Sequence, residues 1–297
     1  MRTTFANTLL SLAQKNPQIM LLAGDLGYSV FEPWQEQIPQ QYLNMGIAEQ
    51  NMAGVAAGLA IEGKIPVIYS IVPFATMRCF EQIRNDICYQ NLNVKIVGVG
   101  AGFSYGPYGH THHGLEDIGI LRALPNMVIL APGDPVEAKA ATIAMMKYKG
   151  PVYLRLGKAG EPVLHDKKPT FTIGKGIVMR EGKDATVIAT STMLETAMKI
   201  PNFRIISMPT IKPIDEKIIV ESAKKTNAIV TLEEHSIIGG LGSAVAEVLA
   251  ESGISIPFKR IGVPDRFTKT IGLQEHMRKA NGLDVDSICC VIQHLLK

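Results

Sequence analysis

The first half of the chain alternates between apolar residues at helical spacing and short runs that are apolar throughout. Phe5, Leu9 and Leu12 share one face of a predicted helix, and the apolar run 19–23 follows it. This order predicts a helix and then a buried strand. Further strands are predicted at 65–69, 94–99, 127–130 and 152–156, with helices at 47–60, 77–90, 115–124 and 135–148. Strands that alternate with helices indicate a parallel sheet covered on both faces.

The pattern lapses between 157 and 173, where Gly, Pro and charged residues replace the apolar runs, and we predict a linker there. A second alternating set follows it. Its predicted strands are 185–189, 203–207, 228–232 and 258–261, and its helices 192–200, 215–224, 239–252 and 284–296. We therefore expect two consecutive parallel-sheet α/β domains, residues 1–165 and 174–297. Ligands of such sheets bind beyond the carboxyl ends of the strands.

Composition narrows the class of protein. A chain of 297 residues suits two domains, and 30 basic against 27 acidic residues, without long runs, argue against a nucleic-acid or anionic-membrane partner. The four cysteines lack the spacing of a metal site or a disulfide framework, which is typical of a reducing compartment. The chain opens without a signal-peptide run, and its most apolar window, 47–61, is too short to span a bilayer. We expect a cytoplasmic protein.

One acid stands out in the segment 44–60, which otherwise holds mainly small and apolar residues. Glu49 lies near the start of the predicted helix, and Gly54 and Gly58 leave room for another helix to approach closely. A buried carboxyl group without a partner resists ionisation, which suits a group that lends and recovers a proton near neutral pH. The structural alternative is that Glu49 complements the positive end of the helix dipole.

Four polar stretches follow predicted strands: 24–29, 69–74, 98–113 and 154–157. In a parallel sheet they would meet at one edge, together with Glu49. The glycines at 98–102 do not form a dinucleotide fingerprint, because a loop and not a helix follows them. The histidines at 110, 112 and 113 could suggest zinc, but too few ligands accompany them. We favour binding of a polar substrate, with at least one histidine in a structural role.

Six separated motifs together resemble the C-terminal half of transketolase, and the likeness covers nearly the whole chain in order. The motifs are 25–29 (DLGYS), 44–50 (NMGIAEQ), 74–78 (FATMR), 111–117 (THHGLED), 121–127 (LRALPNM) and 233–243 (EEHSIIGGLGS). The resemblance implies a pyrimidine-binding domain followed by a transketolase C-terminal domain. It also implies thiamine diphosphate as cofactor and transfer of a two-carbon ketol unit.

The resemblance implies roles for several residues around the cofactor. Glu49 matches the glutamate that meets N1′ of the aminopyrimidine and stabilises its imino tautomer, so that the cofactor can lose its thiazolium C2 proton. Phe74 matches the aromatic residue that stacks on the pyrimidine, with Phe80 as its competitor because spacing here varies by one residue. Asp25 and Ile47 match positions beside the cofactor. Core packing of Phe74 and a turn role for Asp25 are the structural alternatives.

A second group of residues matches the substrate site. His112 matches a histidine that faces the reacting carbons of the donor sugar. Arg2, Ser29 and Arg155 align with positions that hold the phosphate of a sugar phosphate, for which the guanidinium fork is suited. The alternatives are a turn role for Ser29 and a surface ion pair of little energetic weight for Arg155.

Two positions depart from the family pattern. Tyr108 stands in the substrate site where transketolases carry an aspartate that hydrogen-bonds the donor, and Gly100 stands where they carry a further histidine. A site that has lost hydrogen-bonding groups discriminates differently among polyols. We therefore expect a donor or acceptor outside the ordinary pentose phosphates, such as a modified sugar.

The diphosphate-binding sequence of the family, Gly-Asp-Gly followed by Asn, is completed neither at 24–26 nor at 133–135. We therefore expect a separate partner subunit that holds the diphosphate and its Mg or Ca ion. The active site would lie at the interface of an α₂β₂ assembly, with Glu49 and Phe74 reaching across to the cofactor and helix 47–60 packing closely.

Two alternatives stay open at this stage. One is a subunit that decarboxylates a 2-oxo acid, like deoxyxylulose-phosphate synthase or a 2-oxo-acid dehydrogenase, because the Thr111–Gly114 motif also resembles the synthase. The other is an inactive scaffold half, with Tyr108 and Gly100 as signs of decay. The acidic run Glu233-Glu234-His235 is expected to have an interface or structural role.

Overall fold

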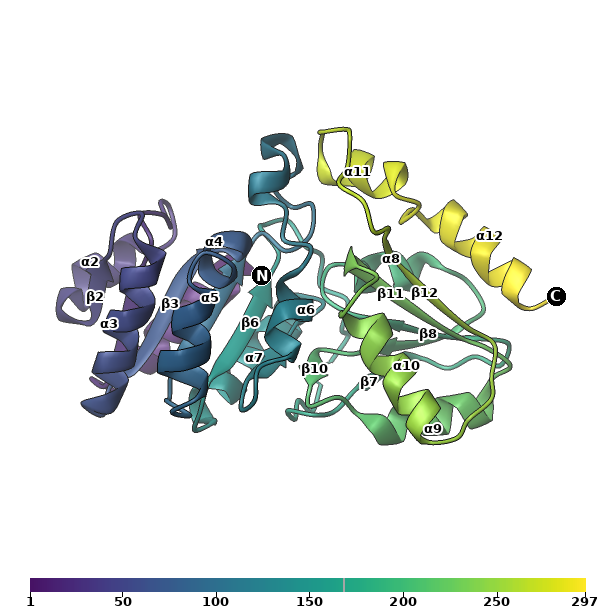
Figure 1. The fold of residues 1–297 in the computed structure, drawn as a ribbon, viewed down its shortest axis with the longest axis horizontal. Helices are drawn as coiled ribbons and strands as arrows, with labels where there is room; N and C mark the ends of the chain where they lie inside the picture. The colour runs from purple at the N-terminus through teal and green to yellow at the C-terminus, as the bar shows by residue number, and fades with distance from the viewer. Residues whose placement is uncertain (168) are drawn as a thin grey trace.

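The computed structural model describes residues 1–167 and 169–297 and contains two mostly parallel sheets side by side (Figure 1). The predicted fold class, two α/β domains, is confirmed. The predicted linker 157–173 includes Lys168, which lies outside the described residues, and the rest of that segment contains no helix or strand.

The first sheet has seven strands among the described residues, in the order β10-β5-β6-β4-β3-β1-β2. Six come from the first half of the chain: β1 (Ile19–Ala23), β2 (Tyr42–Asn44), β3 (Ile65–Ile71), β4 (Lys95–Val99), β5 (Val128–Leu130) and β6 (Val152–Leu156). These six run parallel to one another. The seventh, β10 (Thr210–Lys212), comes from the second half and pairs antiparallel with β5.

Helices cover both faces of this sheet, as its fully buried strands require. One face packs against α1 (Arg2–Ala13), α2 (Glu32–Gln37) and α7 (Pro135–Lys147). The other packs against α3 (Glu49–Ile61), α4 (Val72–Thr76), α5 (Phe80–Gln82), the π-helical turn η2 (Ile83–Cys88) and α6 (Asp117–Arg122).

The predicted single helix at 77–90 is wrong. The chain already turns helical at Val72, where Pro73 occupies a first-turn position that suits its fixed φ, and the helical path then breaks into α4, α5 and η2. Strands β2 and β10 were not predicted, because their three-residue sequences, YLN and TIK, are not apolar throughout.

The second sheet has the order β12-β11-β8-β9-β7. Its strands are β7 (Ile177–Arg180), β8 (Thr186–Ala189), β9 (Arg204–Ser207), β11 (Ile229–Ser236) and β12 (Phe258–Val263), of which β7 runs antiparallel to β9. Its helices are α8 (Met193–Lys199), α9 (Glu216–Lys225), α10 (Leu241–Glu251), α11 (Gln274–Ala280) and α12 (Val285–Leu295). Strand β7 and helix α11 were not predicted.

The two halves share a continuous core. Leu121 and Ile129 of the first half belong to the same buried apolar cluster as Met208 and Leu241 of the second. Strand β10 adds main-chain hydrogen bonding to this contact. The second half can therefore fix the position of loops in the first. No helix in the described part of the chain has the length and apolar character needed to cross a membrane.

Candidate active site

The carboxyl ends of four neighbouring parallel strands meet at one edge of the first sheet. Strands β1, β3, β4 and β6 are neighbours, so the stretches that follow them lie at the same edge. Helix α3 begins at the same edge. Its first residue, Glu49, accepts a hydrogen bond from Ser70 at the end of β3 (Oγ to Oε1, 3.2 Å). The predicted convergence of these stretches is confirmed.

Glu49 is the first residue of α3, and its side chain is buried. Gly24, at the end of β1, lets the carboxylate approach, since a Cβ there would lie 3.4 Å from Glu49 Oε1 and 3.2 Å from Ser70 Oγ. The acid thus lies between two strand ends and also occupies the first helical turn. The position of Glu49 is therefore compatible both with a role in proton transfer and with complementing the positive end of the helix dipole.

Arg78 is a site residue that the sequence interpretation missed. Its guanidinium donates to Glu49 (Nη1 to Oε2, 2.9 Å) and lies 4.0 Å from the ring centroid of Phe74. The sequence left open whether Glu49 is paired, and the structure gives it a cationic partner. The signal was present in the 74–78 motif, because residues four apart on a helical path share a face.

Phe74 and His112 extend this cluster. Their rings meet edge to face at 5.2 Å, and His112 lies 5.1 Å from the ring of Tyr108. Burial lowers the pKa of His112, and the positive charge of Arg78 lowers it further, which favours a neutral imidazole. Phe80, the competitor of Phe74, instead packs against the core beneath α3 and η2. Phe74 is thus the aromatic residue that accompanies Glu49, Arg78 and His112.

The stretch after β1 lies beside the start of α3. Asp25, at φ +50°, exchanges hydrogen bonds with Asn44, each 3.2 Å long. Ser29 also has a positive φ, +61°, and its N–H donates to Glu32 (2.6 Å). Both residues thus adopt turn conformations and remain exposed. Ile47, just before α3, is 79% exposed.

Tyr105 occupies the space opened by one departure from the family pattern. Gly100 has φ +88°, and a Cβ there would lie 2.2 Å from the ring of Tyr105. The ring lies 6.3 Å from that of His112 and carries Lys158 Nζ at 4.9 Å from its centroid. Burial raises the pKa of Tyr105, and the positive charge of Arg2 opposes that rise. Two cations, Arg2 and Lys158, therefore flank this tyrosine.

Arg155 does not face this edge. Its side chain is wholly buried and pairs with Asp117 of α6 (Nε to Oδ2, 2.8 Å). Nη2 donates to the carbonyl oxygens of Gly114 (2.7 Å) and Glu234 (3.1 Å). Both earlier interpretations need correction: Arg155 is no surface ion pair, and its burial between the two halves leaves it unable to reach a phosphate in solvent. Lys158, three residues on and exposed, is the accessible cation at this strand end.

The remaining histidines and the Gly133-Asp134 pair have structural contacts. His113 is buried against the carbonyl of Gly106 (3.2 Å), and His110 Nε2 lies 2.7 Å from the carbonyl oxygen of Thr268. Asp134 is buried and caps α7 through the N–H of Glu137 (2.7 Å). Within residues 1–167 and 169–297, no group of three or more His, Cys, Asp or Glu side chains is arranged to hold a metal ion.

The fold and this site define a two-domain α/β protein with an acid, an aromatic ring and a histidine at the carboxyl edge of its first sheet. The family model of the transketolase pyrimidine-binding domain matches residues 1–160, and that of the transketolase C-terminal domain matches residues 174–288. The chain belongs to the transketolase family. The finer domain boundaries, 1–165 and 174–297, stay a prediction.

Several similar proteins match this chain over nearly their whole length. A putative transketolase C-terminal section of Methanocaldococcus jannaschii is 41% identical over 100% of this chain and 96% of its own length. A 6-deoxy-6-sulfo-D-fructose transketolase subunit of a Clostridium species is 37% identical over 97% and 92%. A solved structure described as a split-gene transketolase, inactive β4 tetramer, is 40% identical, with a TM-score of 0.89 over 99% of this chain and 97% of that one.

Proposed function

We propose that this chain is the catalytic subunit of a two-component transketolase that transfers a two-carbon ketol unit between sugars or sugar phosphates. One cluster of side chains carries the proposal: Glu49, Arg78, Phe74 and His112. It brings a buried acid, a partly exposed aromatic ring and an imidazole with a lowered pKa to the carboxyl edge of the first sheet. Similarity to split transketolase subunits over nearly the whole chain supports it.

The residues present fit one half of thiamine diphosphate, a cofactor that supplies an electron sink for the ketol group when bound. The Phe74 ring offers a stacking face, and Glu49 offers a carboxylate that can hold a proton on a ring nitrogen. In this structure the planar Arg78 guanidinium lies on that face and bonds the same carboxylate. Because its side chain is 48% exposed, Arg78 can turn outward to admit a flat heterocycle.

The substrate end of the site would start at His112. A neutral imidazole there can accept a proton from a sugar hydroxyl or return one to it. Beyond it, Arg2 and Lys158 flank Tyr105 and would hold an anionic end group, while Tyr108 and Ser29 line the exposed rim. An anionic or modified sugar fits this set, and the sulfo-sugar relative supports that choice.

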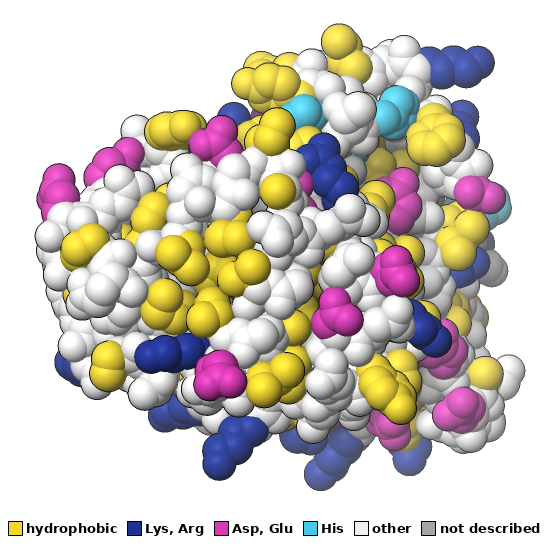
Figure 2. All heavy atoms as spheres, turned by 60° about the vertical axis from the view of Figure 1, so that its left-hand side comes forward, with side chains coloured by type: hydrophobic (Ala, Val, Ile, Leu, Met, Phe, Trp, Pro, Cys, Tyr) yellow, Lys and Arg dark blue, Asp and Glu magenta, His cyan; other side chains and the backbone are white. Residues whose placement is uncertain are grey.

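The partner subunit would cover the α3 end of the first sheet. Exposed apolar side chains occur on the segments around α3, namely Tyr28 (73%), Ile47 (79%), Ile61 (62%) and Tyr89 (86%). Figure 2 shows apolar groups on this side of the molecule. On α3, a Cβ at Gly54 or Gly58 would meet no atom within 4 Å, so the helix surface is flat and open. The partner would bring the diphosphate site and its Mg or Ca ion, in an α₂β₂ assembly.

The catalytic role is tested with the chain reconstituted with a subunit carrying the diphosphate-binding domain. Glu49→Gln should lower ketol transfer about 100-fold or more, because general acid–base groups contribute on that order. Glu62→Gln, exposed at the other end of α3, is the matched control and should retain full activity. Undiminished turnover in Glu49→Gln would remove the proposed role. Carbon dioxide release from pyruvate would instead support the decarboxylating alternative, and inactivity with any donor would favour the scaffold.

The partner surface is tested by blocking it. Gly54→Arg adds a long side chain to open space and should prevent assembly with the partner while leaving the chain folded. Ser11→Arg, at an exposed position of α1, adds the same group elsewhere and should assemble normally. Light scattering of the mixed subunits measures this. Tight binding of thiamine diphosphate by the isolated chain in calorimetry would contradict the shared site.

A further inference from the structure

The loop that carries His112 and Tyr105 is held from outside its own domain. Residues 100–114, here called the histidine loop, leave the first sheet after β4 and return where Gly102 and Gly114 exchange main-chain hydrogen bonds of 2.9 and 3.0 Å. Everything between them projects from the sheet. Figure 1 shows this excursion rising beside α11 of the second half.

Glu234, at the end of β11, reaches into the base of this loop. Its carboxylate is buried and accepts a hydrogen bond from the N–H of Phe103 (2.6 Å). Gly102 makes the approach possible, since a Cβ there would lie 2.6 Å from Glu234 atoms. A charge-assisted bond of this length in a buried setting fixes the main chain where the loop begins.

The same carboxylate is anchored on its other side by α11. Arg278 donates to it through Nε (2.7 Å), and Gln274 donates to both oxygens (3.0 and 3.1 Å) while also reaching Ser104 of the loop (3.4 Å). Thr192 adds a bond of 3.3 Å. Glu234 is therefore the centre of a network that ties the histidine loop to α11.

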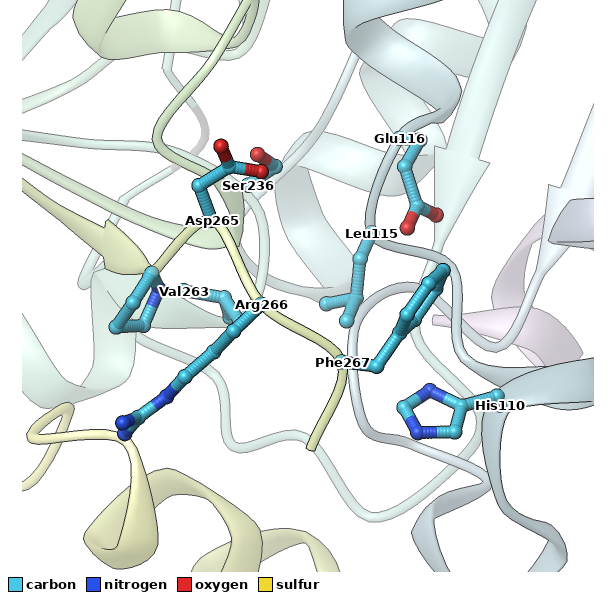
Figure 3. Close-up of a pocket in the computed structure, with 9 residues that line it drawn as sticks. His110, Leu115, Glu116, Ser236, Val263, Asp265, Arg266 and Phe267 are labelled. Carbon is cyan, nitrogen blue, oxygen red and sulfur yellow. The ribbon is translucent and has the colours of Figure 1, made fainter. Parts of the chain in front are cut away.

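Residues 265–272 add a second line of contact along the loop. The rings of Phe267 and His110 meet at 5.1 Å. Figure 3 shows the segment with Arg266 and Phe267 passing beside the segment that carries His110 and Leu115. Further up, the carbonyl oxygen of Gly272 lies against Gly106, where a Cβ would be only 2.3 Å from it. The loop thus follows the surface of the second half from its base to its tip.

We propose that Glu234 is a positioning residue through which the C-terminal domain sets the place of His112 beside Phe74 and Arg78. The kinetic side of this proposal rests on the proposed function, whereas the placement of the imidazole does not. Glu233, the neighbour of Glu234, offers a matched comparison. It is equally buried on the same strand, but it accepts the N–H groups of Leu241 and Gly242 within its own domain.

The test compares Glu234→Gln with Glu233→Gln in the full chain. NMR titration of the imidazole carbons, with the His112 signal assigned from its loss in His112→Gln, should show the pKa of His112 rising toward the ordinary value near 6.5 in Glu234→Gln only. Released from the loop position, the ring would lose the burial and the Arg78 charge that depress its pKa. Equal His112 titration curves in the two variants would overturn the proposal, even if both lower the melting temperature.

The turnover of the reconstituted enzyme provides a second test of the role of Glu234. Glu234→Gln should lower kcat at least about tenfold, because small misplacements of reacting groups are costly, while Glu233→Gln should change it less than about twofold. If the wild-type assembly shows no ketol transfer, the proposed function fails and the titration still decides the role of Glu234. Should Glu234→Gln not fold, Gln274→Ala replaces it, and an unchanged His112 pKa there would overturn the proposal.

Discussion

Arg78 and Glu49 form an ion pair of 2.9 Å in which the acid is buried and the side chain of Arg78 is 48% exposed. The same guanidinium lies on the face of Phe74 and lowers the pKa of His112 through its charge. One cation therefore sets the electrostatics of the acid, the aromatic face and the imidazole together. This pairing, together with the hydrogen bond from Ser70, offsets part of the desolvation cost of burying Glu49 at the start of α3.

Arg78→Met should destabilise the chain by about 1–2 kcal/mol, less than for a fully buried pair because water screens the exposed guanidinium. It should also raise the pKa of His112, since a neighbouring positive charge is removed. Urea unfolding and NMR titration measure the two effects. Arg84→Met, at an exposed position in η2, is the control and should change neither. A lowered or unchanged His112 pKa in Arg78→Met would contradict this account of the cluster.

The Gly100 departure has a steric explanation that can be tested against another glycine. Gly100 and Gly63 have nearly equal φ values, +88° and +82°, but a Cβ at Gly63 meets no atom within 4 Å. Gly63→Ala should therefore lower the free energy of unfolding by about 1 kcal/mol, through backbone strain alone. Gly100→Ala should lower the free energy of unfolding by about 1–3 kcal/mol more than that, because the ring of Tyr105 must move.

Combining Gly100→Ala with Tyr105→Ala isolates that steric part. The cost of Gly100→Ala measured in the Tyr105→Ala background should fall to the level of Gly63→Ala, giving a double-mutant coupling of about 1–3 kcal/mol. Equilibrium urea unfolding of the four chains measures it. Full additivity would mean that Tyr105 does not exclude a side chain at position 100.

The Asp117–Arg155 pair is expected to support the contact between the two halves. Both side chains are fully buried, so Asp117→Asn leaves an uncompensated guanidinium and should cost about 3–5 kcal/mol of unfolding free energy. Arg122 and Glu247 form a comparison pair near the surface, where Glu247→Gln should cost less than about 1 kcal/mol. Similar costs for the two variants would contradict the structural role assigned to Arg155.

Periodicity and motifs together predicted most of the fold and the heart of the site, because strands buried on both faces and a helix of small residues leave clear patterns. They placed Glu49, Phe74 and His112 in one cluster. They could not show that Arg155 points between the domains and Lys158 outward, since side-chain direction at a strand end depends on packing against α6 and β11. For Glu234 they predicted only a general interface or structural role and not its contacts, because its partners lie 131 and 44 residues away in sequence.

His235 and Glu233 form a buried pair in which both side chains are expected to be neutral. Burial lowers the pKa of His235 to about 4 and raises that of Glu233 to about 7. The hydrogen bonds agree with a neutral imidazole: Nδ1–H donates to the carbonyl of Ser236 (2.7 Å), and Nε2 accepts from the N–H of Gly119 (3.2 Å). Charged neighbours change these pKa values less than burial does. Asp117 raises the pKa of His235 and Arg155 lowers it, while Arg155 and Arg122 lower the pKa of Glu233.

The two shifts act on stability with opposite signs. Between pH 4.5 and 6.5 the unfolded chain holds one proton on His235, and the folded chain holds one on Glu233 instead, so the pair alone gives no net slope. Glu233→Gln leaves the histidine shift uncompensated. Relative to wild type, stability should then fall by about 1.4 kcal/mol per unit as pH decreases through this window.

His235→Gln leaves the pKa shift of Glu233 uncompensated. Its stability relative to wild type should therefore fall as pH increases from 4.5 to 6.5, by about 3 kcal/mol over the whole window. The double variant should again parallel wild type. Urea unfolding at pH 4.5, 5.5 and 6.5 gives the slopes directly, and expressing each variant as a difference from wild type removes the contribution of the other titrating groups. Slopes of the same sign, or no slope, in the two single variants would contradict the opposite pKa shifts of His235 and Glu233.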